Sequence, residues 1–312
     1  MKVLVIGSLG YDYIMDFDGR FSERILPDKV HKISLSFLVN KLQRNFGGTA
    51  GNIAYTLRLL GVIPDIIAPV GHDFSPYKQF LKSHGISISH IKSFSNEPCG
   101  SYYVVTDQDD NQIGAYYSGA MKYAKNLPLP KDMDQKLIII SPTDPLAMVM
   151  HALECQKRKI SYVFDPAFQI GSISESDLAK CIDSAKILIG NYYEISLIEK
   201  KLSLSHSELL SKTSVLITTL GHDGSVIETS KQKIKIRPAK PLNTSDPTGA
   251  GDAYRGGFIA GYIRGFNLQT CGQMGSTAAV YTVEKFGTIT HHYTIKDFIK
   301  RYREDFAQNL VL

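Results

Sequence analysis

Short apolar runs, each bounded by turn residues, recur along the whole chain and constrain its fold more than any other feature. The clearest are residues 3–6 (VLVI), 66–70 (IIAPV), 137–140 (LIII), 162–164 (YVF), 187–189 (ILI) and 215–219 (VLITT). Several of these runs are apolar at consecutive positions, which is typical of strands covered on both faces. The runs therefore predict the central strands of a parallel sheet.

Stretches with helical periodicity lie between these runs. One apolar face is spread over residues 50–60 and ends at Gly61, a residue that suits the position just after a helix. Asp144 before Pro145 predicts an N-cap and a first helical turn, and Thr294 with Asp297 predicts a capping box. Because strands alternate with helices, the sequence predicts an α/β fold with a parallel sheet and helices on both faces.

Two segments interrupt this alternation, from about residue 12 to 46 and from about residue 94 to 121. Both contain short alternating stretches instead of helices, and residues 101–106 and 112–117 are typical of a hairpin around a turn at 109–111. Two inserted strand pairs can form a small sheet that stands off the main one. A small sheet over the edge of a parallel sheet is typical of a lid.

Charge and cysteine content exclude several classes of protein. A net charge of +5 is spread along the chain, so we expect no nucleic-acid partner. No apolar run reaches the 18 residues of a membrane span, and the first residues lack a signal-peptide cleavage region. The 4 cysteines are far apart, which argues against a zinc site and a disulfide framework. We expect a cytoplasmic globular protein with no membrane partner.

Two glycine-rich segments stand out, because glycine at a helix start lets a ligand approach the backbone amides. The first, residues 47–52 (GGTAGN), opens the helix that ends at Gly61, and Asn52 offers both a donor and an acceptor. A tight turn into a helix explains this first segment equally well. The second, residues 246–252 (DPTGAGD), places Gly249, Ala250 and Gly251 at a helix start that suits a transferring phosphoryl group.

Asp252 lies in the first turn of the second helix and has two interpretations. It can simply stabilise the helix dipole, which is common. It can also act as a general base beside a phosphate cradle and take the proton of an attacking hydroxyl. Arg255, which follows in the same helix, is interpreted as a structural ion-pair partner. The P-loop, dinucleotide, hydrolase-elbow and zinc-protease motifs are all missing from the sequence.

Taken together, the two glycine-rich segments resemble the signatures of the ribokinase-like (PfkB) carbohydrate and nucleoside kinases. Residues 246–252 are similar to the more specific, C-terminal signature. The resemblance covers essentially the whole chain and implies one kinase domain over residues 1–312 with the two lid segments inserted. It also implies that Asp252 is the base and that Gly249, Ala250 and Gly251 hold charge on the transferring group.

Two further segments are similar to the part of the family that binds the phosphate donor. Asn191 and Glu194 match its N-x-x-E element, which implies ATP as donor with Mg²⁺ held by Glu194 through water. Thr219 and Gly221, with Gly224 following, are similar to the stretch that borders the nucleotide.

Within the family, the chain is most similar to the bacterial adenosine kinases. The residues that carry this likeness are 19–23 (GRFSE), 31–39 (HKISLSFLV) and 117–121 (YSGAM). The resemblance implies that Asp12 binds the ribose hydroxyls, with Gly48 and Asn52 completing the grip; a loop Asp that stabilises a turn is the alternative. Tyr102 and Tyr116 fall on the lid hairpin, where an aromatic pair can sandwich the adenine and ordinary packing is the alternative.

Three more residues complete the candidate acceptor site. Ser8 and Ser36 are interpreted as minor polar contacts, for which a structural role in turns is the alternative. Gln169 is interpreted as a contact to the purine or the ribose. His291 and His292 are interpreted as an exposed pair that does not bind metal.

The chain departs from its relatives in the lid, which has no tryptophan and carries tyrosine where we expect phenylalanine at the stacking positions. This departure keeps guanosine, inosine and cytidine among the candidate acceptors. The expected reaction is ATP-dependent phosphorylation of the 5′-hydroxyl of adenosine to AMP, a step of purine salvage. The alternatives are a broad-specificity nucleoside or sugar kinase and a non-catalytic nucleotide-binding regulator. Lid sheets with an apolar outer face pair in this family, so we expect a homodimer.

Overall fold

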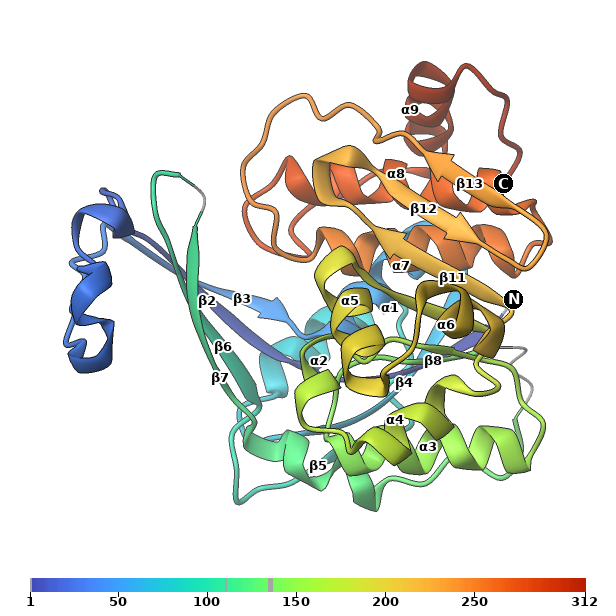
Figure 1. Cartoon of the computed structure of the whole chain (residues 1–312), viewed down its shortest axis with the longest axis horizontal. Coiled ribbons are helices and arrows are strands. Elements are labelled where there is room, and N and C mark those ends of the chain that lie inside the picture. Colours follow the sequence, from blue (N-terminus) through green and yellow to red (C-terminus); the bar gives the residue numbers. More distant parts are fainter. Residues whose placement is uncertain (1, 110, 134–136) are drawn as a thin grey trace.

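The computed structural model describes residues 2–109, 111–133 and 137–312. Within them, the main sheet has nine strands in the order β13-β12-β11-β10-β9-β8-β1-β4-β5 (Figure 1). Their bounds are β1 Lys2–Ile6, β4 Ile63–Val70, β5 Ile91–Ser93, β8 Ile138–Ile140, β9 Tyr162–Phe164, β10 Ile187–Asn191, β11 Val215–Thr219, β12 Ser225–Glu228 and β13 Lys233–Ile236. Neighbouring strands from β5 to β11 pair in parallel, whereas β12 and β13 are antiparallel additions.

Each of the six apolar runs forms a strand of this sheet. Within one strand, successive side chains enter two different cores: Val3 and Val5 belong to one hydrophobic cluster, and Leu4 and Ile6 belong to the other. This coverage on both faces explains why the runs are apolar at consecutive positions. The predicted α/β fold with a parallel sheet is confirmed.

Helices cover both faces of the sheet. One face carries α1 Thr49–Leu59, α2 Ser75–Ser83, α7 Ala250–Tyr262, α8 Leu268–Val283 and α9 Ile295–Phe306. The other carries α3 Pro145–Lys157, α4 Glu175–Ile182, α5 Tyr192–Leu202 and α6 His206–Lys212. Short 3₁₀ helices are η1 Phe21–Glu23, η2 Pro27–Lys32, η3 Gly119–Asn126, η4 Ala167–Gly171 and η5 Gly221–Asp223.

The three helix boundaries predicted from capping residues are confirmed. The carboxylate of Asp144 accepts a hydrogen bond from the N–H of Ala147 at 3.1 Å. Thr294 and Asp297 form a reciprocal capping box at the start of α9. Gly61 follows α1 with φ +74°, in the left-handed region where glycine is favoured.

A second sheet of four strands, in the order β3-β2-β6-β7, stands off the main sheet on the left of Figure 1. Its strands are β2 Gly10–Asp16, β3 Lys41–Gly47, β6 Gly100–Thr106 and β7 Gln112–Tyr117. They arise from the two segments that were expected to break the alternation, and β6 and β7 form the expected hairpin. Asp110, which the sequence predicts for the turn of that hairpin, lies outside the described residues.

One prediction outside the sheets is wrong. His291 is buried, not exposed, and its carbonyl accepts a hydrogen bond from the hydroxyl of Tyr55 at 2.7 Å. This burial lowers the pKa of His291 to about 4, so the imidazole stays neutral. Across the described ranges, none of the helices has the length and apolar character that crossing a membrane requires.

Candidate active site

The second glycine-rich segment forms the turn that starts α7. Gly249 is the N-cap with φ +82°, and a Cβ there would lie 2.9 Å from the side chain of Thr288. Asp246 shapes the turn, because its carboxylate accepts hydrogen bonds from the N–H groups of Thr248 (2.9 Å) and Gly287 (3.0 Å). The N–H of Ala250 donates to the carbonyl of Pro247 at 3.2 Å. The amides that follow in the first turn remain without a helical partner and point the positive end of the dipole outward.

Asp252 lies in this first turn and is tied to the first glycine-rich segment. Its Oδ2 accepts a hydrogen bond from Nδ2 of Asn52, on α1, at 2.8 Å. Burial raises the pKa of Asp252 to about 6, although the charge of Arg255 and the bond from Asn52 oppose the rise. A carboxylate with a pKa near 6 is ionised at neutral pH and can still accept a proton, as a general base must.

Arg255 is an ion-pair partner within the protein, as expected. Its Nη2 donates to Oδ1 of Asp165 at 2.7 Å, and its Nε lies 2.5 Å from Oδ2. Both side chains are buried, and the charge-assisted hydrogen bond from Nη2 to Oδ1, together with the ion contact of Nε, holds the two side chains in place. The pair joins α7, one turn beyond Asp252, to the segment that follows β9.

Four residues in register cross the small sheet on the face of Asp12. Asp12 pairs with Asn45 on β3 and with Tyr102 on β6, and Tyr102 pairs with Tyr116 on β7. Residues directly opposite each other in a sheet share a face. Asp12 is 7% exposed, and its burial, with the nearby charges of Asp252 and Asp246, raises its pKa to about 7. The structure therefore brings Asp12 close to the carboxylate of Asp252.

The two tyrosines do not face each other across a gap, and in this respect the expected sandwich is wrong. Adjacent strands lie only about 4.8 Å apart, which is too close for a base between two rings that rise from one face. The Tyr102 hydroxyl lies over Gly114, where a Cβ would come within 2.4 Å of it. The Tyr116 hydroxyl donates to Sδ of Met121 at 3.2 Å. Tyr102 and Tyr116 thus form one wall, and any opposite wall must come from elsewhere.

Ser8 and Gly48 shape the start of α1. The Ser8 hydroxyl accepts a hydrogen bond from the N–H of Thr49 at 3.1 Å. Gly48 is the N-cap with φ +86°, and a Cβ there would lie 2.6 Å from the Ser8 carbonyl. Both residues therefore hold the turn from which Asn52 reaches Asp252.

Ser36 and Gln169 differ in their surroundings. Ser36 is exposed in the connection between η2 and β3, which lies at the far left of Figure 1, away from α7. Gln169 is buried in η4, and its Nε2 donates to the carbonyl of Thr143 at 2.7 Å. Of these two residues, only Gln169 lies at the edge of the site formed by Asp12, Asn52 and Asp252.

A cavity of about 800 Å³ lies beside the start of α7. It is lined by all five residues expected to border the nucleotide, namely Asn191, Glu194, Thr219, Gly221 and Gly224, together with Ala250 and Gly251. Sequence reasoning missed its apolar walls, which include Pro238, Pro241, Ala279, Val280 and Val283. The positions in α8 have the periodicity of ordinary core residues, so no local signal marks them.

The donor set next to this cavity suits a magnesium ion held through water. Asn191 and Glu194 form a capping box at the start of α5, in which Oε2 of Glu194 accepts the N–H of Asn191 at 2.7 Å. The charge of Glu194 is felt by both Asp252 and Arg255. Within the described ranges, no three His, Cys, Asp or Glu side chains are grouped to bind a metal directly. A magnesium ion that keeps several waters fits this arrangement.

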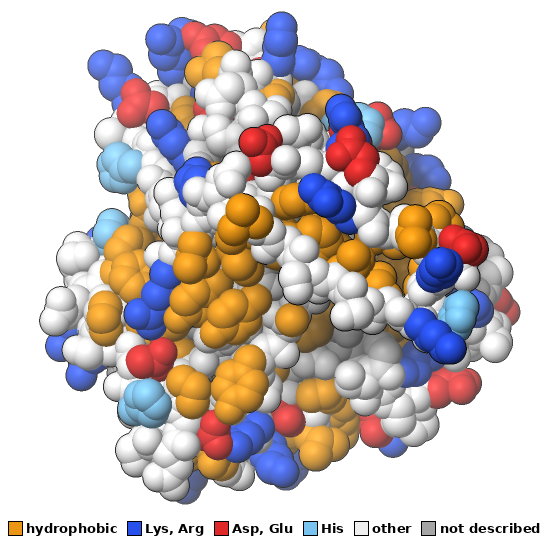
Figure 2. Space-filling view, turned by 90° about the vertical axis from the view of Figure 1, so that its left-hand side faces the viewer, with side chains coloured by type: hydrophobic (Ala, Val, Ile, Leu, Met, Phe, Trp, Pro, Cys, Tyr) orange, Lys and Arg blue, Asp and Glu red, His pale blue; other side chains and the backbone are white. Residues whose placement is uncertain are grey.

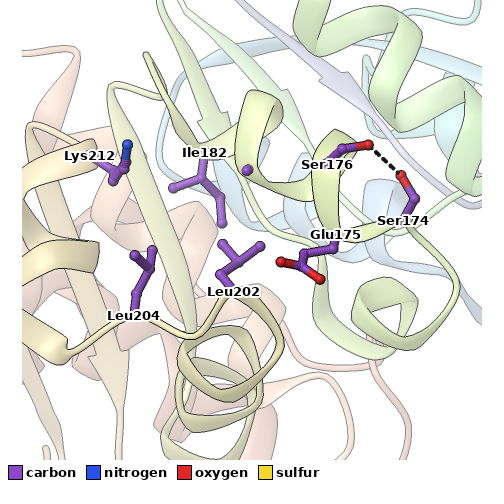
Figure 3. A pocket seen from close by; sticks show the side chains of 8 residues that line it. Ser174, Glu175, Ser176, Ile182, Leu202, Leu204 and Lys212 are labelled. Atoms are coloured by element: carbon purple, nitrogen blue, oxygen red, sulfur yellow. Dashed lines mark hydrogen bonds between the residues drawn. The ribbon is translucent and has the colours of Figure 1, made fainter.

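Another hollow, of about 540 Å³, lies between α4 and the α5–α6 connection (Figure 3). Its lining includes Glu175, Ile182, Leu202, Leu204 and Lys212. It contains none of the predicted site residues, so we place the candidate active site at the start of α7.

Comparisons with known proteins agree with this fold. Residues 2–294 match the family described as "pfkB family carbohydrate kinase", and the chain belongs to this family. The nucleoside kinase of Methanothermobacter thermautotrophicus is 33% identical over 311 residues, which cover 96% of this chain and 95% of that one. The chain is therefore a phosphotransferase that acts on an alcohol group of a nucleoside or sugar, with ATP as the phosphoryl donor.

Solved structures extend the comparison. The structure of Burkholderia thailandensis nucleoside kinase in complex with inosine has a TM-score of 0.93 and 32% identity, and covers 98% of this chain and 99% of that one. The ligand-free form of the same kinase has a TM-score of 0.82 and 34% identity, and covers 96% of this chain and 99% of that one. The chain thus resembles the inosine complex more than the ligand-free form.

Proposed function

We propose that this chain is a nucleoside kinase that phosphorylates the 5′-hydroxyl of adenosine to give AMP. The observation that supports it is the grouping of Asp12, Asn52 and Asp252 beside a cavity lined by Gly251. A nucleoside needs two features from such a site, a grip on its ribose hydroxyls and a base near its 5′-oxygen. The likeness to two nucleoside kinases supports a nucleoside over a free sugar.

The residues divide the reaction between them. Asp12 binds the ribose hydroxyls, and Asn52 holds Asp252 in place. The 5′-oxygen attacks the γ-phosphorus, its proton passes to Asp252, and the bond from the γ-phosphorus to the β–γ bridging oxygen breaks to release ADP. The free amides at the start of α7 stabilise the negative charge on the transferring group. Glu194 and Asn191 would hold Mg²⁺ through water, and the bound ion would neutralise charge on the ATP phosphates.

Broad acceptor specificity is the second candidate function. The relative from Burkholderia thailandensis binds inosine, and the tyrosine wall on the small sheet offers ring faces on which any base can stack. Under this alternative, inosine, guanosine and cytidine are phosphorylated about as well as adenosine.

Release of ADP and the mass of the product decide between these functions. The purified chain is given ATP and Mg²⁺ with adenosine, inosine, guanosine, cytidine, ribose or fructose 6-phosphate, one at a time. We expect adenosine to have the highest kcat/KM and to yield a product with the mass of AMP. Equal values for the four nucleosides favour broad specificity. Turnover of sugars alone contradicts the proposal, and turnover of none favours a non-catalytic regulator.

The outer face of the small sheet supports a homodimer as part of this proposal. It exposes Leu42 (62%), Tyr103 (42%), Ile113 (42%) and Tyr117 (50%), on the face opposite to Asp12. Figure 2, which faces this side of the molecule, shows hydrophobic side chains gathered there. Contiguous exposed apolar surface is typical of a protein interface.

Sedimentation velocity tests the dimer with two matched variants. Leu42→Asp should shift the chain to monomer, whereas Leu146→Asp, at a leucine of similar exposure (61%) on α3, should not. A wild-type chain that sediments as a monomer at micromolar concentration contradicts the homodimer.

A further inference from the structure

Phe168 projects from the main domain toward the small sheet. It belongs to η4, three residues after Asp165, and 57% of it is exposed. Its ring lies 5.7 Å from the ring of Tyr116, centroid to centroid, at an angle of 45°. An exposed phenylalanine therefore contacts the tyrosine wall on the same face of the small sheet that carries Asp12.

The backbone around Phe168 is anchored on both sides. Asp165 is held by the buried ion pair with Arg255, and Gln169 is held by its hydrogen bond to the carbonyl of Thr143. Between them, Ala167 has φ +40°, in the left-handed region that a non-glycine residue adopts only with backbone strain. Strained backbone conformations cluster at functional sites. A contact with a ligand would explain why this strained turn holds an exposed ring beside the candidate site.

From this arrangement we infer that Phe168 supplies the second wall of the nucleobase site. The base lies between the ring of Phe168 and the wall formed by Tyr102 and Tyr116, and it replaces the ring contact between Phe168 and Tyr116. This inference rests on the proposed nucleoside kinase activity. It makes Phe168 a specificity-determining residue that acts on the base and not on the ribose or the phosphates.

Steady-state kinetics give the first test. Phe168→Ala should raise the KM for adenosine by about 5- to 150-fold, the range that follows from loss of one aromatic stacking contact. The KM for ATP should not change, and neither should the inhibition constant of ribose, which has no base. Phe168→Tyr keeps the ring and should match the wild type.

Phe94→Ala is the matched control. Phe94 is a partly exposed ring that stacks on Tyr123 with centroids 4.4 Å apart, outside the grouped site residues. Its loss should leave the KM for adenosine unchanged. If Phe168→Ala and Phe94→Ala have the same KM as the wild type, the inference is overturned while the proposed function stands.

A second readout does not depend on turnover. The sequence contains no tryptophan, so Phe168→Trp introduces a single indole fluorophore. Adenosine should change its emission, ribose should not, and neither ligand should change the emission of Phe94→Trp. An emission of Phe168→Trp that adenosine leaves unchanged overturns the inference. If the wild-type chain phosphorylates no nucleoside but adenosine still changes this emission, the proposed function fails and the base site stands.

Discussion

The donor side and the acceptor side of the candidate active site are built in different ways. The donor cavity is walled by helices α7 and α8 and by loops of the main sheet, and its residues contribute mostly backbone and apolar surface. The acceptor side is a row of candidate side chains on a separate small sheet, whose strands are seen in Figure 1. The geometry of the donor side is therefore fixed by the core of the main sheet, whereas the geometry of the acceptor side depends on how the small sheet is placed.

A buried ionic network holds the donor side. Arg301, on α9, donates from Nη2 to the carbonyl of Lys240 at 2.6 Å and to Oε1 of Glu284 at 2.7 Å. Asp305 accepts the N–H of Lys240 at 3.2 Å and contacts Nε of Arg301 at 3.3 Å, and Glu284 accepts the N–H of Leu242 at 2.7 Å. Lys240 lines the donor cavity, so the C-terminal helix positions a wall of that cavity.

The acceptor side lacks a comparable network. The contacts of Asp12 within the described residues include no cation, and the hydroxyl of Thr288 is 3.5 Å from its Oδ2. A buried carboxylate with so few hydrogen bonds destabilises the ligand-free protein. Hydrogen bonds from the hydroxyls of a ligand would offset this cost. The donor side thus has its internal contacts already formed, whereas under the proposed function the acceptor side gains contacts from the nucleoside.

The largest expected effect lies where the two sides meet. Asp252→Asn keeps the shape and removes the proton acceptor, so kcat should fall by at least about 100-fold with little change in either KM. Asp297→Asn is the matched control, because Asp297 is a first-turn carboxylate of α9 that only caps a helix. Stopped-flow or steady-state assays of both variants decide the point. A near wild-type kcat for Asp252→Asn means that this residue also only stabilises its helix.

The next effect should be confined to the acceptor side. Asp12→Ala should raise the KM for adenosine by about 10- to 150-fold, which corresponds to a charge-assisted hydrogen bond of about 1.5–3 kcal/mol. The KM for 3′-deoxyadenosine should change much less, because one partner hydroxyl is already missing, and the KM for ATP should not change. If the KM rises equally for the two nucleosides, Asp12 lies outside the ribose site. The distinction between the donor side and the acceptor side then fails.

Local signals in the sequence were enough to predict the sheet and its helix boundaries. The runs of apolar residues, the N-cap at Asp144 and the capping box at Thr294 each act within a few residues, so a pattern reveals them. The glycine-rich segment before Asp252 is similarly local. Its role could be proposed from the sequence because backbone conformation, helix start and carboxylate lie within one short stretch.

Features that depend on long-range packing could not be predicted. The orientation of Tyr102 and Tyr116 depends on the register of β6 and β7 and on the room above Gly114. Arg301 contacts Lys240, 61 positions away in sequence, and Phe168, in η4, contacts the ring of Tyr116 on the small sheet. Nothing near these residues in sequence distinguishes them from ordinary surface or core positions.

The third effect tests the donor side. Arg301→Ala removes the contacts that hold Lys240, so the KM for ATP should rise by about tenfold, the equivalent of one hydrogen bond to a charged group. The KM for adenosine should stay within twofold or so of the wild type. Arg303→Ala, at an exposed position of the same helix, is the control and should change neither constant. A rise in the adenosine KM alone contradicts the division between the two sides.

The smallest effect distinguishes the two sides by their stability. The pKa of Asp12 is raised from 3.8 to about 7 in the folded chain, mainly by burial. A raised pKa contributes stability that is present below pH 4 and is lost as the pH rises through 7, by up to about 1.4 kcal/mol per pH unit. Asp12→Asn should therefore have a higher melting temperature than the wild type at pH 8 and a smaller increase at pH 5.

Arg301→Ala should have a lower melting temperature than the wild type at both pH values, because the guanidinium that it removes is charged throughout this range. Thermal melts without ligand test both, and an Asp12→Asn gain that is the same at pH 5 and pH 8 means that this carboxylate does not titrate in the window.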